Sequence, residues 1–303
     1  MADLRVTITG VEFKNPVIMA SGMFGYGREY EKMYSLSRLG GICVNGMTLK
    51  EKPGNPTPRI AESYSGVLSS TGMPNDGIDK FLSDELPNLK TKDTVIIANI
   101  AGGNIDELCK IVEKTSGSDV DMLEVNLAAP NMQKGGSAFG TCQIGVEETV
   151  KAIKPYAKKP MIIKLPPNLT QIPEMAKAAE ANGADAISLI GAVPAMRFDV
   201  KIKKPLLKAN FGGLTGLAVF PIAQRMVYQA AHAVKIPVIG LGGIGCWQDA
   251  AEMLIAGAKA VQIGSILFSY PYVPLNIIDG LTNYLERENI DSIEKLCASG
   301  ELW

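Results

Sequence analysis

Eight short apolar runs recur along the whole chain and constrain its fold more than any other feature. They are rich in β-branched residues, as expected of strands that are buried on both faces. Helical patterns separate them, for example Pro173 to Asn182, which is rich in alanine and is followed by Gly183, the residue expected after a helix. This alternation predicts an α/β fold, a TIM (β/α)8 barrel, rather than an open sheet. The runs are Val17 to Ser21, Gly41 to Gly46, Val95 to Ala101, Asp121 to Asn126, Met161 to Leu165, Asp185 to Ile190, Pro237 to Gly242 and Ala260 to Gly264.

The sequence also predicts an N-terminal hairpin and two long insertions in addition to the barrel. Arg5 to Ile8 and Val11 to Phe13 flank a two-residue turn, which predicts an N-terminal β-hairpin that plugs the bottom of the barrel. Long insertions rich in Gly and Pro follow strands 2 and 6, from Leu49 to Leu89 and from Gly191 to Ala218, and would lie over the active-site face. No linker or low-complexity stretch is visible, so residues 1–303 are expected to form a single domain.

The charge balance restricts the class of partner. The chain has 30 Lys and Arg residues against 31 Asp and Glu residues, so no overall basic field favours nucleic acid or an anionic membrane. No run of about 18 apolar residues occurs, and the first residues contain no apolar signal core. We therefore expect a cytoplasmic protein that binds a small-molecule substrate.

Cysteine and histidine usage argues against a metal centre. The five cysteines are widely spaced and include no Cys-x-x-Cys pair, so we interpret them as reduced thiols. The single histidine, His232, lies in a helix-like stretch and is interpreted as structural. One histidine also excludes a histidine-based catalytic triad or a multi-histidine metal site.

In a TIM barrel the reactive residues lie at the carboxyl ends of the strands. Here those ends are polar and mostly uncharged, and no pair of carboxylates supports glycosidase or two-metal chemistry. The residues at these ends are Ser21, Asn45, Asn99, Asn126, Lys164, Gly191, Gly242, Gly243, Gly264 and Ser265.

Glycines close strands 7 and 8, where barrels often bind phosphate. Gly242, Gly243 and Gly264 would let backbone N–H groups approach such a ligand closely. The alternative is that these glycines serve only tight turns.

Three side chains at other strand ends point to a polar ring. Lys164 ends a buried strand, where an unpaired ammonium is unfavourable, so we expect an anion or an electron-rich ring beside it. Asn99 and Asn126 also end apolar strands, and their amides can donate and accept, as the edge of a flavin or a pyrimidine requires.

Several motifs follow one another along the chain in a characteristic order and spacing. They resemble the dihydroorotate dehydrogenase family nearly from end to end, and most closely the catalytic subunit of the class 1B enzymes. The motifs are Ala20-Ser-Gly-Met-Phe-Gly-Tyr-Gly27, Gly54-Asn-Pro-Thr-Pro-Arg59, Asn126-Leu-Ala-Ala-Pro-Asn131, Gly135-Gly-Ser-Ala-Phe-Gly140, Ile163-Lys-Leu-Pro-Pro-Asn168 and Gly240-Leu-Gly-Gly-Ile244.

The resemblance implies a barrel that holds FMN, whose isoalloxazine exchanges a hydride with a carbon of the substrate. Asn45 stands where the family usually has a lysine, so one positive charge near the flavin is missing, while Lys164 remains to stabilise a reduced anionic flavin. The implied FMN contacts are Ala20, Ser21, Asn45, Asn99, Asn126, Lys164, Gly216, Gly242, Gly243, Gly264 and Ser265.

The substrate side departs further from the family pattern. Ala129 occupies the place of the cysteine that acts as base in soluble members, and a methyl group cannot transfer a proton. Ser69 stands where the family has an asparagine, and Gly191-Ala192 replaces an Asn-Thr or Asn-Ser pair. The implied substrate contacts are Ser69, Gly72, Met73, Asn126, Ala129, Asn131, Gly191 and Ala192.

These departures favour a substrate other than orotate, because lost hydrogen-bond partners and smaller side chains give a wider, less polar pocket. Ser70 or a bound water is the least implausible substitute for the missing base, ahead of Ser69, Thr71 and Tyr26, although no activating group is visible nearby. Cys142, which follows the same loop, is interpreted as a helix-start residue.

The leading hypothesis is an FMN-dependent oxidoreductase that transfers hydride between FMN and a carbon–carbon bond conjugated to a carbonyl, with Lys164 supporting the reduced flavin. A divergent dihydroorotate dehydrogenase that uses a serine or water as base is the first alternative. A flavin-binding but non-catalytic subunit is the second, and a flavin-free phosphate-binding isomerase or aldolase is the weakest. The resemblance also implies a homodimer and a partner subunit that carries FAD and an iron–sulfur cluster.

Overall fold

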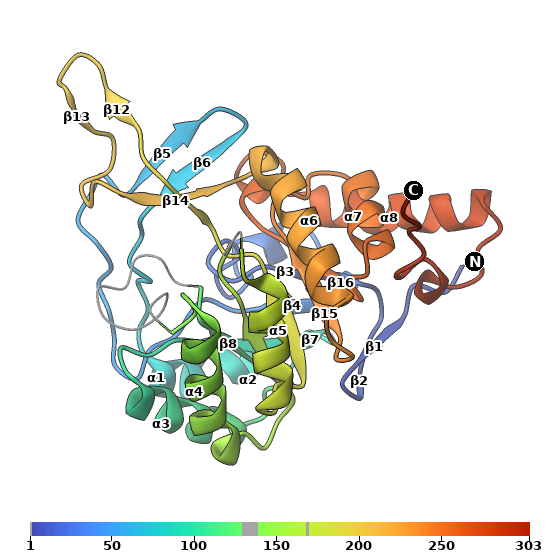
Figure 1. Cartoon of the computed structure of the whole chain (residues 1–303), viewed down its shortest axis with the longest axis horizontal. Helices are drawn as coiled ribbons and strands as arrows, with labels where there is room; N and C mark the ends of the chain where they lie inside the picture. The colour runs from blue at the N-terminus through green and yellow to red at the C-terminus, as the bar shows by residue number, and fades with distance from the viewer. Residues whose placement is uncertain (1, 129–138, 168–169) are drawn as a thin grey trace.

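The computed structural model describes residues 2–128, 139–167 and 170–303. Its centre is a closed barrel of parallel strands in which each strand pairs with the next along the chain and β16 pairs with β3 to close the ring (Figure 1). The expected barrel is therefore confirmed, although several strands are shorter than expected. The barrel strands are β3 (Val17–Met19), β4 (Gly41–Cys43), β7 (Val95–Ile100), β8 (Met122–Asn126), β9 (Met161–Lys164), β10 (Ala186–Leu189), β15 (Val238–Leu241) and β16 (Ala260–Ile263).

Amphipathic helices cover the barrel, because the strands are apolar on their outer faces as well as inside. The helices α3, α4 and α5 lie on one side, and α6, α7 and α8 lie on the other (Figure 1). The expected end of α5 is confirmed, since Gly183 follows it with φ +101°. The helices are α1 (Ile78–Lys80), α2 (Leu86–Leu89), α3 (Ile105–Ser116), α4 (Gln143–Ile153), α5 (Ile172–Ala181), α6 (Phe220–Ala231), α7 (Trp247–Ile255) and α8 (Val273–Arg287).

Short helical turns complete the connections. A π-helical turn, η3 (Phe81–Glu85), joins α1 to α2, so that residues 78–89 are helical throughout. The connection from β3 to β4 contains only 3-10 turns in place of a covering α-helix. The 3-10 turns are η1 (Tyr30–Lys32), η2 (Leu36–Arg38), η5 (Lys154–Tyr156), η6 (Leu217–Val219), η7 (Ser265–Phe268) and η8 (Ile293–Lys295).

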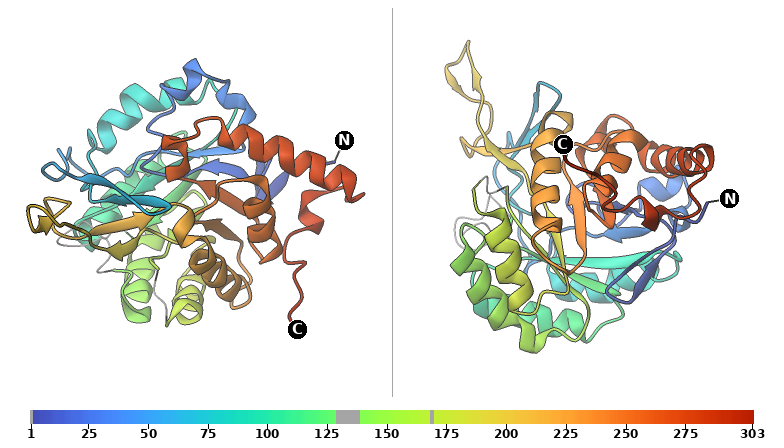
Figure 2. Two further views of the ribbon diagram at one scale, coloured as in Figure 1. Left: turned by 90° about the horizontal axis from the view of Figure 1, so that it is seen from above. Right: turned by 45° about the vertical axis from the view of Figure 1, so that its right-hand side comes forward.

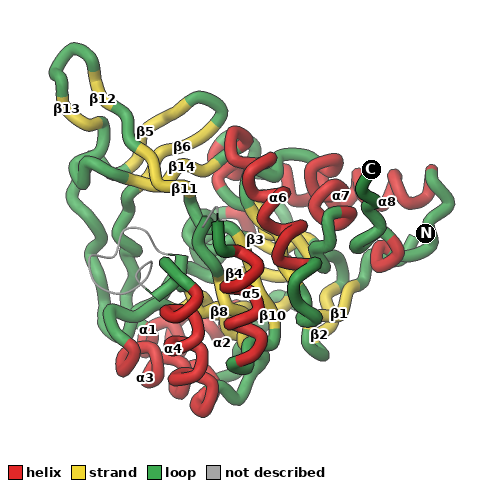
Figure 3. The backbone as a smooth tube through the Cα atoms, viewed as in Figure 1, coloured by secondary structure: helices red, strands yellow, loops and turns green. Residues whose placement is uncertain are grey.

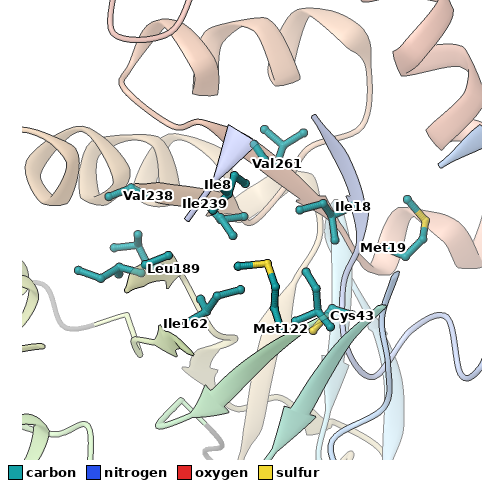
Figure 4. Packing of buried hydrophobic residues seen from close by; sticks show 14 of the residues in the cluster. Ile8, Ile18, Met19, Cys43, Met122, Ile162, Leu189, Val238, Ile239 and Val261 are labelled. Atoms are coloured by element: carbon teal, nitrogen blue, oxygen red, sulfur yellow. The ribbon is translucent and has the colours of Figure 1, made fainter. Parts of the chain in front are cut away.

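The N-terminal hairpin closes the bottom of the barrel, as expected. Its strands, β1 (Val6–Ile8) and β2 (Val11–Phe13), pair in antiparallel fashion across the two-residue turn. Ile8 and Phe13 are fully buried. Figure 4 shows Ile8 among side chains of the barrel strands, including Ile239. The hairpin therefore adds to the same hydrophobic core.

The two insertions meet in one antiparallel sheet with the strand order β11-β14-β6-β5, a pairing that the sequence analysis did not anticipate. This sheet lies at the opposite end of the molecule from the β1–β2 hairpin (Figure 3). A narrow ribbon, β12–β13, extends away from it (Figures 1 and 2). The strands are β5 (Ile60–Ser63), β6 (Gly66–Ser69), β11 (Val193–Ala195), β12 (Phe198–Asp199), β13 (Lys204–Pro205) and β14 (Gly212–Thr215).

The cysteines and the histidine take the structural places expected of them. All five cysteines are free thiols, and Cys142 is the residue at which α4 begins. His232 caps the end of α6, where its ring stacks on Tyr228 at 3.9 Å between centroids. Among the described residues, no three side chains are grouped to hold a metal ion. The helices described here also include none that is long and apolar enough to cross a membrane.

Candidate active site

A cavity of about 270 Å³ opens at the carboxyl end of the barrel. Its floor is formed by strand ends such as Ala20, Lys164 and Gly264, and the insertion sheet contributes Ser69 and Leu214 to its wall. Segments that lie far apart in the sequence therefore converge on one site, at the end of the barrel where the fold places catalytic residues.

Most of the residues expected to bind cofactor or substrate line this single cavity. Lys164 is the only ionisable side chain among the described residues that line it. The expected residues that line the cavity are Ala20, Ser21, Asn45, Ser69, Met73, Asn126, Lys164, Gly191, Ala192, Gly216, Gly242, Gly243, Gly264 and Ser265.

Three expected residues lie behind the cavity lining, and two cannot be placed. Asn99 is fully buried, and Gly72 is buried against the side chain of Asn55. Ser70 is 1% exposed, and its Oγ accepts a hydrogen bond from Asn55 Nδ2 at 3.1 Å. Its neighbour Thr71 does line the cavity. The role of Ser70 as base therefore stays a prediction. Ala129 and Asn131 lie outside the described residues.

A buried carboxylate that the sequence analysis missed lies at the floor of the site. Glu124, on β8, is fully buried, and its Oε1 lies 3.3 Å from Lys164 Nζ. The anion expected beside Lys164 is therefore a group of the protein itself. A lone charged residue inside the apolar run of β8 was the available signal, because an ionised side chain at such a position requires a partner.

Four further donors surround this carboxylate. Asn99 Nδ2 donates to Oε1 at 2.6 Å, and Cys43 Sγ donates to the same oxygen at 3.2 Å. Ser188 Oγ and Gln262 Nε2 donate to Oε2, at 2.8 and 2.7 Å. These four residues come from four different strands, so the carboxylate links those strands by hydrogen bonds inside the barrel.

The electrostatics of the pair keep Glu124 ionised. Burial alone raises the pKa of this carboxyl, but the Lys164 ammonium and the donors Gln262, Ser188 and Cys43 outweigh it and hold the pKa below its ordinary value. At neutral pH the group is therefore an acceptor only.

The turn after β15 lines the cavity, and its backbone conformation and close packing both require glycine. Gly242 and Gly243 have φ angles of +124° and +78°, which other residues rarely adopt. A Cβ on Gly243 would also lie 2.6 Å from the backbone N of Phe220, the first residue of α6. The turn therefore packs directly against the start of α6, as expected of glycines that serve a tight turn. Their approach to a phosphate stays a prediction.

Two buried acceptors test whether the cavity fits a flavin. Asn45 Oδ1 and Gln262 Oε1 have no hydrogen-bond partner within the described chain, and both residues line the cavity. A buried acceptor without a partner costs about 1–3 kcal/mol. A bound group with N–H donors relieves that cost, and the polar ring of FMN carries such a donor among its acceptors. The residues present therefore fit FMN.

Comparisons with known proteins show which family this chain is similar to. The family described as dihydroorotate dehydrogenase matches residues 3–285. A Caldicellulosiruptor bescii protein named "Dihydroorotate dehydrogenase B (NAD(+)), catalytic subunit" is 49% identical over 98% of this chain and 99% of its own length. A Bacteroides fragilis protein of the same name is 46% identical over 100% of both chains.

A solved structure supports the fold. DHODH from Eimeria tenella, crystallised in complex with ferulenol, superposes with a TM-score of 0.81, covering 98% of this chain and 88% of that one, at 20% identity. The extent of the family match and the identity to these relatives lead to one conclusion: the chain belongs to the dihydroorotate dehydrogenase family.

Proposed function

We propose that this protein is an FMN-dependent oxidoreductase that transfers hydride between FMN and a carbon–carbon bond conjugated to a carbonyl. One observation carries the proposal: Asn45 Oδ1 and Gln262 Oε1 are buried acceptors without partners in the described chain, and both residues line the cavity that also collects most of the expected FMN contacts. Residues 1–303 form its single FMN-binding domain.

Different residues of the cavity would bind the phosphate and the ring of the cofactor. Backbone N–H groups of the Gly242-Gly243 and Gly264-Ser265 turns would hold the phosphate, since these residues line the cavity and glycine leaves room for close contact. Lys164 would supply positive charge to the polar edge of the ring, and Asn126 would supply amide hydrogen bonds, since both residues line the cavity. FMN, when bound, supplies the hydride acceptor or donor.

We propose further that the substrate is not orotate. Gly191 and Ala192 line the cavity together with Ala128, and a Cβ on Gly191 would lie 2.6 Å from the Cβ of Ala128. Small apolar side chains thus fill the wall where the family pattern has polar ones. Each lost hydrogen-bond partner of a charged pyrimidine would cost about 1–3 kcal/mol. A bulkier or less polar substrate, such as a cyclic enone or amide, suits this wall.

Reduction of such a substrate needs a proton on the product carbon, and the protein need not supply a strong acid for this step. Ser69 and Thr71 line the cavity as hydroxyls, and no described carboxylate or imidazole lines it with them. Reduction of an enone proceeds under these conditions, because solvent or a weak acid can protonate the product carbon.

A second candidate function is dihydroorotate oxidation with a serine or water as base. The names of relatives 49% and 46% identical favour it. The third candidate, a flavin-binding subunit without catalysis, predicts a bound flavin that no substrate reduces.

We also propose a partner subunit that carries FAD and an iron–sulfur cluster, because relatives are named catalytic subunits. Leu217 and Phe268 line the cavity yet are 47% and 54% exposed, and Tyr270 and Tyr272 follow Phe268 on the surface. This apolar rim would offer such a subunit a contact at the mouth of the cavity. The homodimer and the cytoplasmic location stay predictions.

The test uses protein loaded with FMN and photoreduced without oxygen. Cyclic enones, cyclic unsaturated amides and orotate are added separately, and reoxidation of the flavin is followed by absorbance. We expect reoxidation by a member of the first two classes and little by orotate. Rapid reoxidation by orotate favours the second candidate, and no reoxidation by any of them favours the non-catalytic subunit.

A further inference from the structure

Glu124 contacts two groups that line the cavity but does not line it itself. Its Oε1 lies 3.3 Å from Lys164 Nζ, and its Oε2 accepts a hydrogen bond from Gln262 Nε2 at 2.7 Å. Lys164 comes from β9, which is next to β8, and Gln262 comes from β16, which is opposite β8 in the barrel order. One carboxylate therefore constrains both groups.

The chemistry of this contact fixes the orientation of the Gln262 amide. A carboxylate only accepts hydrogen bonds, so the NH2 end of the amide must face Glu124 and the oxygen must face away. Gln262 is 1% exposed, and its Oε1 has no partner within the described chain. Gln262 thus combines a fixed amide orientation with an unpaired acceptor, and the residue lines the cavity.

Glu124 also fixes the orientation of a second series of amides, which runs through Asn99 to Asn126. Asn99 Nδ2 donates to Glu124 Oε1 at 2.6 Å, so Asn99 Oδ1 is left to accept from Asn126 Nδ2 at 3.4 Å. Asn126 Oδ1 in turn accepts from the backbone N–H of Ala128 at 2.9 Å. Each amide in this path can take only one orientation while Glu124 is a carboxylate.

We propose that Glu124 is a positioning residue that aims the Gln262 amide oxygen and the Lys164 ammonium into the cavity, and so specifies a ligand ring with an N–H donor and an acceptor at its edge. The imide edge of a flavin or a pyrimidine has this pattern. The inference rests on the proposed function, because FMN supplies the ring by which it is tested.

The experiment compares Glu124→Gln with Ser188→Ala in protein reconstituted with FMN. Both changes remove a hydrogen bond from the same buried network, but Ser188 does not line the cavity. In Glu124→Gln an amide meets an amide, so Gln262 can turn its NH2 toward the ligand. We expect FMN to bind roughly tenfold more weakly to Glu124→Gln, and within about twofold of wild type to Ser188→Ala.

The midpoint potential of the bound FMN gives a readout that a structural role would not change. Without the carboxylate, the charge of Lys164 is unbalanced, so the potential in Glu124→Gln should shift to more positive values, while Ser188→Ala leaves it unchanged. Equal affinities and equal potentials for the two variants would overturn the inference. Failure of the wild type to bind FMN would instead overturn the proposed function.

Gln262→Met keeps the inference testable if Glu124→Gln does not fold. Methionine has a similar length and no amide, so FMN affinity should fall roughly tenfold. Where Glu124→Gln does fold, adding it to Gln262→Met should increase the loss little, because both changes act on one acceptor. Unchanged FMN affinity in Gln262→Met would refute the role of its oxygen.

Discussion

Lys164 Nζ lies 3.3 Å from Oε1 of Glu124, and the two side chains are 7% and 0% exposed. Removing both charges from water is costly, and the cost is offset here by the four other donors to the carboxylate. A buried ion pair directly beside a cavity therefore indicates a role in function as well as in stability.

Replacing Lys164 with alanine should affect both stability and cofactor binding. The change leaves the carboxylate of Glu124 buried without its cation, which costs about 3–5 kcal/mol. It also removes the only charge that lines the cavity among the described residues, so FMN affinity should fall about tenfold or more. Denaturant unfolding and FMN titration measure the two effects.

Lys154→Ala is the matched control for this variant. Lys154 pairs with Asp185 at 3.0 Å, but the side chains are 36% and 34% exposed, so its loss should cost less than about 1 kcal/mol. FMN binding should not change. Flavin retention and reduction kinetics in Lys164→Ala that match those of Lys154→Ala would remove Lys164 from the site.

Stability should depend on the ionisation of Glu124 at acid pH. Its pKa in the folded state lies below the ordinary value of 4.5, because Lys164 and the hydrogen-bond donors outweigh the effect of burial. Its contribution to stability is therefore complete above about pH 4.5 and is lost as the pH falls through the lower folded pKa. Glu124→Gln should flatten this part of the stability profile, measured by unfolding in denaturant between about pH 6 and 3. Parallel profiles for wild type and variant would contradict the assignment.

Gly191 should tolerate no larger side chain without loss of stability. A Cβ there would lie 2.6 Å from the Cβ of Ala128 and 3.0 Å from its backbone oxygen. Gly191→Ala should therefore cost about 1–3 kcal/mol in thermal or denaturant unfolding. Gly117→Ala is the control, since its nearest neighbour would be 3.6 Å away and α3 has already ended. Equal stability of the two variants would show that the wall beside Ala128 is loosely packed.

Restoring a cysteine should not restore dihydroorotate oxidation. Ala129→Cys returns the base that the family pattern implies, but Ser69, Gly191 and Ala192 remain at the substrate positions. Steady-state assays with dihydroorotate should stay near background. Strong activity from this single change would mean that the substrate positions were misassigned.

The barrel could be predicted from the sequence because its signals are local. Each strand is a separate apolar run, and a turn with positive φ at Gly10 or Gly183 marks where an element ends. The shared sheet of the insertions could not be predicted in this way. Strands β6 and β14 pair across a long stretch of chain, for example Leu68 with Leu214, and neither carries a local signal that names its partner.

The candidate site likewise contains residues that local sequence signals predict and residues whose place depends on tertiary packing. Its glycines, asparagines and Lys164 were found because they end strands, whose ends converge in this fold. Glu124 was missed because it lies within a strand, and its contact with Gln262 depends on β8 and β16 facing one another across the barrel. Asn99 and Ser70 were expected in the lining but lie behind it, since burial depth depends on packing rather than on position along a strand.

The most direct test of the central claim is an anaerobic visible spectrum of the FMN-reconstituted protein, before and after addition of dihydroorotate. The account predicts a yellow protein with oxidised flavin bands that persist after the addition. Bleaching of those bands would contradict the claim of a different substrate, and a protein that remains colourless after incubation with FMN would contradict the claim of a flavoenzyme.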